Sequence, residues 1–325
     1  MLNLCLKVNT DTNFTLTEEQ IKKPLGHDIL VATKAVSLNP VDQKVKANKV
    51  GKTIGYDASG IILEVGADVT LFKVGDEVFY AGDVTREGTF AKYHLVDERI
   101  VGRKPTTLTH LQAASLPLTS ITAYEGLHEQ LGIKTGKSIL VINGAGGVGS
   151  MVIQLAKLHG LKVIATASKE DSIEWVKKLG ADVVINHRKD LQEELIKNDI
   201  KQVDYIFCNH STEENFNTMA EIIAPQGRIV SIVEVSKPLD LGKLFSKKAS
   251  FSWELMFTKS MYQTEDLQSQ HDILNKISKL IDEGKIIHTA KNILGVLSED
   301  SLKKGLNDVA AGGSVGKSVF EVDFS

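Results

Sequence analysis

Three glycines spaced as Gly144-x-Gly146-x-x-Gly149 could bind a dinucleotide. They follow the apolar stretch "SILVIN" and open "VGSMVIQLAKLHG", whose apolar residues recur at helical spacing. In a strand–turn–helix unit the first glycine permits the tight turn, the second lets the backbone approach a pyrophosphate, and the third allows close helix–strand packing. The helix N-terminus then points free N–H groups at the phosphates. We therefore predict a dinucleotide site that also includes Gly147 and Val148; a glycine-rich turn without a ligand is the alternative.

The elements around this loop predict an α/β protein. From 119 to 255, apolar strands alternate with amphipathic helices, as in "KVIATA", "DSIEWVKKLG", "DVVIN", "VDYIFC", "FNTMAEIIA" and "RIVSIV", which is typical of a doubly wound parallel sheet. Residues 1–118 hold short β-branched stretches separated by glycines, which predict a mostly antiparallel β domain. Residues 256–325 predict helices near 265–283 and 299–310 and a last strand, "GKSVFEVDF", packed on the first domain.

Composition excludes several partner classes. The 325 residues are 42% hydrophobic, enough for two domains, and the formal net charge is -3 with lysines scattered along the chain. We expect a small-molecule partner, and neither nucleic acid nor a membrane. There is no signal-peptide pattern and no apolar run of roughly 18 residues, so a cytoplasmic location is expected. The only cysteines, Cys5 and Cys208, are expected to be reduced.

The residues after the strand "KVIATA", the second predicted strand of region 119–255, favour NADPH. An NAD-binding protein places an acidic residue about 20 positions past the glycine loop, whereas "KVIATASKED" has Ala167, Ser168 and Lys169 there. A hydroxyl and a cation suit a 2′-phosphate. Alternatively, Ser168 caps the next helix with Asp171 completing a capping box, and Lys169 is a solvated charge. Glu170 or Asp171 could still bind the ribose of NADH.

The whole chain resembles the medium-chain dehydrogenase/reductase superfamily, within it the zinc-free quinone oxidoreductase (zeta-crystallin-like) branch, and most of all proteins labelled zinc-type alcohol dehydrogenase-like. The segments that carry the resemblance are "SLNPVD" (37–42), "GYDASG" (55–60), "GDEVFYAGD" (75–83), "DERIVGRKP" (97–105), "LPLTSITAYEGL" (116–127), "NGAGGVGS" (143–150), "GADVVINHRKD" (180–190), "WELMFTKSM" (253–261) and the closing "GKSVFEV".

The resemblance implies an α/β architecture with a GroES-like β domain and a Rossmann doubly wound parallel-sheet domain. Residues 1–118 would form the first part of the GroES-like catalytic domain, 119–255 the Rossmann NADP-binding domain, and 256–325 a segment completing the catalytic domain. The cofactor would lie between the two domains. A homodimer through the Rossmann edges is also implied.

No zinc site is expected. Zinc-dependent relatives carry cysteine, histidine and cysteine at the places of Asn39, Tyr56 and Leu118, and none of these can replace a thiolate or imidazole. The four-cysteine structural loop is missing between "YAGD" and "VTREGTF". Two other pairs, Glu125-x-x-His128 and Cys208-x-His210, have ligand-like types, but each stands alone. We expect the first on a helix near the domain junction and the second lining the cofactor cleft.

The candidate catalytic residues lie near the former metal position. In "TIGYDASG" (53–60), Tyr56 takes the place of a zinc-binding histidine and Asp57 that of the neighbouring acidic residue. Tyr56 could donate its hydroxyl to a developing oxyanion, or be only a half-buried pocket wall. Asn39 could line the pocket, or form an Asn-Pro turn. Lys44 could reach the same cleft, or be a surface charge.

Four further residues are implied as cofactor contacts. Thr119 and Thr122 match residues flanking the nicotinamide, with helix capping as the alternative. His187 stands where relatives often have a tyrosine near the adenosine phosphate. Lys317 could reach the cofactor from the other domain, although an exposed lysine is the simpler interpretation.

These residues predict a zinc-independent NADPH-dependent oxidoreductase. Without a metal to stabilise an alkoxide, good acceptors are those already electrophilic, namely quinones and other conjugated carbonyls. The protein would supply position and hydrogen-bond donors for direct hydride transfer. The alternatives are an enone or enal double-bond reductase and a non-catalytic, crystallin-like protein that binds NADPH without turnover.

Overall fold

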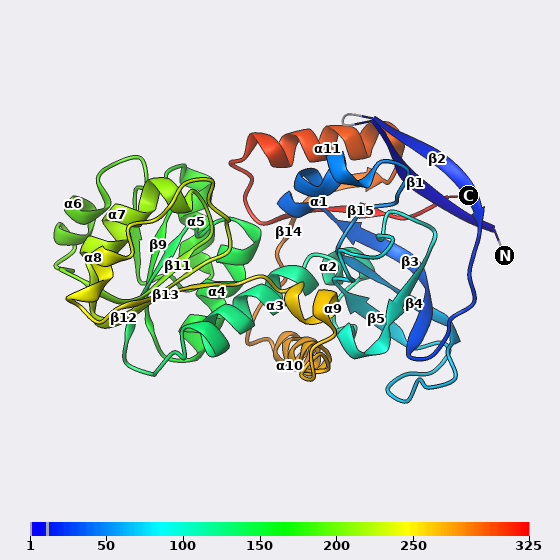
Figure 1. Ribbon diagram of the computed structural model, residues 1–325, viewed down its shortest axis with the longest axis horizontal. Coiled ribbons are helices and arrows are strands. Elements are labelled where there is room, and N and C mark those ends of the chain that lie inside the picture. The colour runs from blue at the N-terminus through cyan, green and yellow to red at the C-terminus, as the bar shows by residue number, and fades with distance from the viewer. Residues whose placement is uncertain (1, 11–12, 325) are drawn as a thin grey trace. The chain divides into compact units, whose positions relative to one another are not determined.

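The computed structural model describes residues 2–10 and 13–324, which fold into two compact units (Figure 1). The first, which we call the β unit, runs to Ile121 and resumes at Phe257. The second, the α/β unit, is Thr122–Met256. None of the helices in the described part of the chain is long and apolar enough to cross a membrane.

The α/β unit contains a six-stranded, all-parallel sheet in the order β10-β9-β8-β11-β12-β13. The strands are β8 (Ser138–Ile142), β9 (Lys162–Thr166), β10 (Val183–Ile185), β11 (Val203–Cys208), β12 (Ile223–Ser231) and β13 (Ser250–Trp253). The strand order reverses between β8 and β11, and ligands of such sheets bind outside the carboxyl ends of the strands at that point. The first five strands were predicted. The sixth was missed because "SFSW" is short and alternates with serine.

Helices cover this sheet (green to yellow in Figure 1). They are α4 (Gly147–Leu158), α5 (Glu170–Lys178), α6 (Leu191–Ile196), α7 (Thr212–Ile222) and α8 (Gly242–Phe245), with a π-helical turn, η3 (Gly126–Gln130). Apolar side chains from α6, α7 and α8 share one core with side chains of the strands, including Leu195, Phe216, Leu244 and Ile206. Strands buried on both faces explain the near-continuous apolar runs in the sequence.

The β unit is built on a mostly antiparallel sheet in the order β14-β15-β3-β4-β5-β7, with β6 also paired to β3. Its strands are β3 (Asp28–Ser37), β4 (Ala58–Val65), β5 (Glu77–Tyr80), β6 (Tyr93–Asp97), β7 (Val101–Arg103), β14 (Ala290–Val296) and β15 (Lys317–Glu321). A separate hairpin joins β1 (Leu2–Thr10) and β2 (Asn13–Gln20). Because β15 pairs with β3, the last strand of the chain lies beside residues near position 37.

The remaining helices are α1 (Pro40–Val45), η1 (Lys46–Lys49), η2 (Glu98–Ile100), α2 (His110–Ala113), α3 (Pro117–Glu125), α9 (Thr258–Tyr262), α10 (Ser269–Asp282) and α11 (Glu299–Ala311). The last two confirm the helices predicted near 265–283 and 299–310. With a mostly antiparallel β unit and a parallel doubly wound sheet, the predicted α/β fold class is confirmed.

His94 on β6 is part of the core of the β unit. Its ring stacks on Tyr80 at 5.5 Å between centroids, and Nε2 lies 2.9 Å from the carbonyl oxygen of Glu87. Burial lowers the pKa of His94 to about 4. The folded protein therefore holds this imidazole neutral at pH values where the unfolded chain protonates it.

Replacing His94 should change the acid sensitivity of the fold. Between about pH 6.5 and 4 the unfolded chain binds a proton at His94 that the folded chain does not, so stability falls as the pH falls through this window. We expect wild type to lose on the order of 3 kcal/mol more than His94→Gln between pH 7 and pH 4, measured by urea unfolding. Identical losses in both proteins would contradict this assignment.

Candidate functional site

A buried carboxylate, Asp57, accepts four hydrogen bonds just before β4. Its Oδ2 receives Ser37 Oγ at 2.8 Å, Asn39 Nδ2 at 2.8 Å and Lys317 Nζ at 3.0 Å, and its Oδ1 receives the backbone N–H of Leu118 at 2.8 Å. Asp57 is completely buried and Lys317 is 4% exposed. A buried charge is tolerated when a counter-ion and hydrogen bonds compensate it. We call these five residues the Asp57 cluster.

The glycines of "GYDASG" are needed to place Asp57. Gly55 has φ +108°, in the region that favours glycine, and a Cβ there would lie 2.6 Å from the ring of Phe90. A Cβ on Gly60 would lie 2.2 Å from the carbonyl oxygen of Ala32 on β3. The segment is therefore a tight entry into β4 that fixes the carboxylate between them.

Asn39 is the N-cap of α1, with Pro40 as the first helical residue. Its side-chain amide donates to Asp57 and accepts from Lys317 Nζ, and it is 1% exposed. Its backbone N–H donates to Asp42 Oδ2 at 2.7 Å. The predicted Asn-Pro turn is therefore present, and the side-chain amide that was predicted to line the pocket is occupied by protein partners.

The two candidate lysines have different surroundings. Lys317 was predicted to reach the cofactor or, more simply, to be an exposed lysine. The exposed-lysine interpretation is wrong, because the ammonium group is buried and donates to Leu38 O at 2.5 Å, to Asn39 and to Asp57. All three of its donors are used inside the β unit, which leaves none for a cofactor. Lys44 is exposed on α1, in agreement with the surface-charge alternative.

Tyr56 is completely buried, rather than half-buried as expected. Its ring packs edge-to-face on Phe257, with centroids 5.4 Å apart. Within residues 2–10 and 13–324, no hydrogen-bond partner meets its hydroxyl oxygen. Burial, followed by the charges of Asp42, Asp83 and Glu87, raises the pKa of Tyr56 above its ordinary value. The phenol is therefore a neutral O–H group with an unused donor.

Asp42 is a second buried carboxyl that sequence reasoning did not select. It is completely buried on α1, and its Oδ1 has no hydrogen-bond partner among the described residues. Burial raises its pKa to about 8, although the N–H of Asn39 and the charge of Lys317 act in the opposite direction. The spacing Asn39-Pro-x-Asp42 is that of a helix cap and its third residue, which was the available signal.

The residues present do not fit zinc. Asn39, Tyr56 and Leu118 do converge, since Asn39 Nδ2 lies 3.5 Å from Tyr56 O and Leu118 donates to Asp57. They offer an engaged amide, a neutral phenol and an aliphatic side chain, whereas zinc takes thiolate, imidazole or carboxylate. The described part of the chain holds no group of three or more His, Cys, Asp or Glu that could bind a metal.

Packing also explains the two isolated pairs of ligand-type residues, Glu125 with His128 and Cys208 with His210. His128 stacks on Tyr124 with centroids 4.3 Å apart, and Glu125 is buried on α3. Cys208 is buried at the end of β11, with Sγ 3.2 Å from His210 O, and burial raises the pKa of its thiol. Among the described residues, neither pair belongs to a group of three or more His, Cys, Asp or Glu that could hold a metal ion.

The glycine loop fits a bound pyrophosphate. Gly146 is the N-cap of α4 and contributes no side-chain acceptor to the free N–H groups of the first turn. A Cβ on Gly149 would lie 2.3 Å from Asn143 O, and one on Gly144 would lie 2.9 Å from Ala165 Cβ. Helix and strand are thus packed too closely for any other residue at these two positions. Gly147 and Val148 form the first helical turn, whose N–H groups suit an anion.

Ser168, one of the two residues predicted to bind the 2′-phosphate, lies beside His187 beyond β9 and β10. Ser168 Oγ lies 3.4 Å from His187 Nε2, and Lys169 and His187 are exposed. The alternative in which Ser168 caps α5 is wrong. Lys169 is the N-cap, and its N–H donates to Ser172 Oγ at 3.0 Å. Partial burial and then the charges of Arg188 and His210 lower the pKa of His187.

Two threonines and an asparagine complete the candidates. Thr119 and Thr122 are buried on α3, and Thr119 Oγ1 donates to the carbonyl oxygen of Leu116, the residue before the helix, at 3.0 Å. Asn209 follows β11, where its Nδ2 donates to Ile142 O at 2.9 Å and its Oδ1 is buried without a partner among the described residues. It was missed because one asparagine after a strand carries no distinctive pattern.

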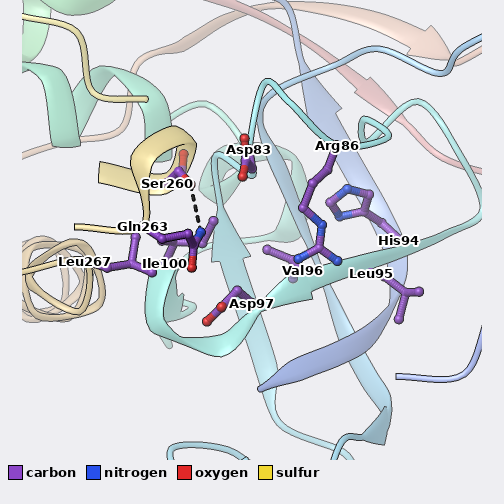
Figure 2. Close-up of a pocket in the computed structure, with 10 residues that line it drawn as sticks. All are labelled: Asp83, Arg86, His94, Leu95, Val96, Asp97, Ile100, Ser260, Gln263 and Leu267. Atoms are coloured by element: carbon purple, nitrogen blue, oxygen red, sulfur yellow. Dashed lines mark hydrogen bonds between the residues drawn. The ribbon is translucent and has the colours of Figure 1, made fainter. Parts of the chain in front are cut away.

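A small surface pocket elsewhere in the β unit is not this site. Figure 2 shows its lining, in which the one hydrogen bond drawn runs from Gln263 Nε2 to Ser260 O. About 290 Å³ of empty space, which includes space open to solvent, lies among its lining residues. Arg86 is held by Asp28 through two hydrogen bonds of 2.8 and 2.9 Å. No residue of the Asp57 cluster lines it.

Comparisons with known proteins match both units. Residues 26–106 match the family described as alcohol dehydrogenase GroES-like domain, and residues 147–274 match zinc-binding dehydrogenase. A zinc-type alcohol dehydrogenase-like protein of Staphylococcus epidermidis is 41% identical over 311 residues, covering 93% of each chain.

Solved structures share the fold over the whole chain. The structure of a zinc-dependent alcohol dehydrogenase-like protein from Rhizobium etli CFN 42 is similar with a TM-score of 0.95 and 43% identity, covering 100% of this chain and 99% of that one. A quinone oxidoreductase from Coxiella burnetii is similar with a TM-score of 0.82 and 25% identity, covering 99% and 100%.

Neutralising Asp57 should destabilise the protein. Asp57→Asn leaves the Lys317 ammonium buried without a counter-ion, and breaking a buried pair this way costs about 3–5 kcal/mol. We expect the free energy of unfolding, measured with urea, to fall by that amount in Asp57→Asn. The double variant Asp57→Asn/Lys317→Met should recover part of this loss. Asp68→Asn, at an exposed aspartate of the same unit, is the control. If Asp57→Asn lost as little stability as Asp68→Asn, the buried Lys317 charge would not depend on Asp57 as its counter-ion.

Proposed function

Since the chain belongs to the medium-chain dehydrogenase/reductase superfamily, among the zinc-type alcohol dehydrogenase-like proteins, we propose that it is a zinc-independent, NADPH-dependent oxidoreductase that transfers hydride to a quinone or other electrophilic carbonyl. The observation that carries this proposal is the Asp57 cluster. By resemblance, Asn39 and Leu118 of this cluster and the neighbouring Tyr56 stand where zinc-dependent relatives carry their metal ligands. None of the three suits zinc, and the Tyr56 hydroxyl has an unused donor.

The proposed class of acceptor follows from the proposal that no zinc ion takes part in the reaction. Oxidising an alcohol requires stabilising an alkoxide, which zinc does in metal-dependent relatives. A quinone or conjugated carbonyl accepts hydride more readily because conjugation spreads the developing negative charge. The Asp57 cluster offers no cation to such an oxyanion, because Lys317 is committed to protein acceptors.

Tyr56 is the proposed donor to the reduced acceptor. Its raised pKa keeps the phenol protonated, so it can donate a hydrogen bond to an oxyanion. Packing against Phe257 holds the ring in place, and a donor that is already oriented needs little reorganisation. Asn39 positions Asp57 and Lys317 and has no direct role in this proposal.

NADPH is the proposed cofactor, and it would supply the hydride. Gly144, Gly146 and Gly149 would hold its pyrophosphate, with the first turn of α4 directed at the phosphates. Ser168 and Lys169 would hold the 2′-phosphate. The lowered pKa of His187 means that protonation of this ring would accompany phosphate binding as the pH falls.

The proposed activity is tested by mixing protein and NADPH with phenanthrenequinone or with a 2-alkenal and following NADPH absorbance. We expect oxidation with the quinone, and a loss of about 100-fold in kcat/KM in Tyr56→Phe. Tyr262→Phe, which alters an exposed tyrosine of the same unit, should match wild type. Tight NADPH binding with no oxidation by either acceptor would reject catalysis and favour a binding protein.

An enone or enal reductase is the second candidate, favoured by Asp42. Double-bond reduction needs a proton at carbon after hydride transfer, and a buried carboxyl with a pKa near 8 is protonated at neutral pH. A saturated carbonyl product from the 2-alkenal would identify this activity. An alcohol product would exclude it.

Lys169 should discriminate between the two nicotinamide cofactors. Lys169→Glu replaces an exposed cation with an anion beside Ser168, so repulsion should weaken NADPH binding at least tenfold more than NADH binding. Lys162→Glu, at an exposed lysine on β9, is the control. Equal losses for both cofactors, measured by fluorescence titration, would count against the 2′-phosphate assignment.

We also propose that two copies associate through β13, one of the two edge strands of the parallel sheet. Trp253 is 46% exposed and Leu255 54% exposed at this edge, and an unpaired edge is a template for pairing with another strand. Sedimentation velocity should give a dimer for wild type and a monomer for Trp253→Glu. A monomeric wild type would reject this assembly.

A further inference from the structure

We propose that Trp175 on α5 is a positioning residue for pyrophosphate binding: through the Ser150 hydroxyl it fixes the peptide group between Gly146 and Gly147, whose N–H would face the cofactor phosphates. This role rests on the proposed function, because the glycine loop is the proposed cofactor site. Trp175 itself does not touch the cofactor in this proposal. All four residues belong to the α/β unit.

Two hydrogen bonds in series lead from α5 to the glycine loop. Trp175 Nε1 donates to Ser150 Oγ at 2.9 Å, and Ser150 Oγ donates to the carbonyl oxygen of Gly146 at 2.7 Å. The same hydroxyl makes a longer contact of 3.4 Å with the carbonyl oxygen of Ala145. Ser150 is completely buried and Trp175 is 5% exposed, so these groups depend on each other rather than on water. We call the two bonds the indole chain.

The direction of the indole chain is fixed by the chemistry of its members. An indole nitrogen can only donate, so the Ser150 hydroxyl must accept from Trp175, and its single hydrogen is left for Gly146 O. In such a series each bond polarises the next, which strengthens both. Removing the indole N–H would leave a buried acceptor of Ser150 unfilled and would weaken the bond from the hydroxyl to the carbonyl.

The orientation of Gly146 O determines the direction of the next N–H group. The carbonyl of Gly146 and the N–H of Gly147 belong to one planar trans peptide group, so they point in opposite directions. Gly146 O accepts both the backbone N–H of Ser150, at 2.9 Å, and its hydroxyl, which directs the carbonyl into the first turn of α4. The Gly147 N–H therefore points out of the helix, in the direction from which a helix N-terminus binds a phosphate.

The position of α5 makes it suited to this role. A Cβ on Gly144 would lie 3.4 Å from Val176 Cγ1, so the residue after the tryptophan packs against the glycine loop itself. At its other end, α5 begins at Glu170, directly after Ser168 and Lys169, the proposed 2′-phosphate residues. One helix thus connects the proposed 2′-phosphate site with the proposed pyrophosphate site, and the indole chain is its hydrogen-bonded link to the second.

Nuclear magnetic resonance of the indole N–H groups tests the indole chain in the unaltered protein. The sequence has two tryptophans, Trp175 and Trp253, so isotope-labelled indoles give two signals, which Trp253→Phe assigns. ADP-ribose, which contains the pyrophosphate, should move the Trp175 signal to lower field, because a phosphate on the Gly147 N–H polarises the peptide group and strengthens each bond behind it. In Ser150→Ala this shift should be lost. A Trp175 signal that stays in place while ADP-ribose binds wild type would overturn the proposal.

Binding titrations separate this role from a general effect on the α/β unit. Trp175→Phe keeps an aromatic ring in the core and removes the N–H, so it should bind ADP-ribose about tenfold more weakly than wild type does. Adenosine 2′-monophosphate, which has no pyrophosphate, should bind both proteins equally well. Trp253→Phe, the same substitution at an exposed tryptophan, should bind ADP-ribose as wild type does.

A double variant shows whether the two side chains act in series. Ser150→Ala should also weaken ADP-ribose binding about tenfold, and Trp175→Phe/Ser150→Ala should lose no more affinity than the more affected single variant, because either change breaks the indole chain. Losses that multiply in the double variant, or equal losses for ADP-ribose and adenosine 2′-monophosphate, would overturn the proposal. NADPH binding that is the same in wild type and Trp175→Phe would overturn it and leave the proposed function intact. Failure of wild type to bind either NADPH or ADP-ribose would reject the proposed cofactor and this role together.

Discussion

The buried ion pair between Asp57 and Lys317 is the interaction on which the candidate site depends. It joins the residue that opens β4 to the first residue of β15, and Asp57 also fixes Asn39 at the start of α1 and the backbone of Leu118. The C-terminal strand is therefore part of the site as well as part of the sheet. A buried pair of this kind is a modest source of stability but a strong constraint on geometry, since neither charge can be left alone.

This constraint also determines the chemistry of the β unit. The Lys317 ammonium group donates to Asp57 and to the carbonyl oxygens of Leu38 and Asn39, so the cluster has no free ammonium group to offer a substrate. Two groups with unused hydrogen-bonding capacity remain in the same buried region, the Tyr56 hydroxyl and the Asp42 carboxyl. Both have raised pKa values, so both hold protons at neutral pH. The site is suited to giving protons rather than to stabilising an alkoxide with charge.

Local patterns in the sequence predicted much of the fold and only part of the site. The glycine loop, five parallel strands, α10 and α11 could be read because their spacing reflects local geometry. The burial of Lys317 could not be predicted, because its partner Asp57 lies 260 residues away in the chain. Tyr56 was placed correctly near Asn39, but its complete burial depends on Phe257, which follows the whole α/β unit. Asp42 was not selected from the sequence, because its raised pKa comes from burial and from its position relative to Lys317 and Asp57, which local sequence does not reveal.

Zinc content is the most direct test of the central claim that an internal ion pair has replaced the metal. Elemental analysis of protein purified without chelator should find far less than one zinc per chain, and NADPH oxidation by a quinone should be unchanged after treatment with a strong chelator. One tightly held zinc per chain, with activity lost on its removal and restored by its return, would contradict the account.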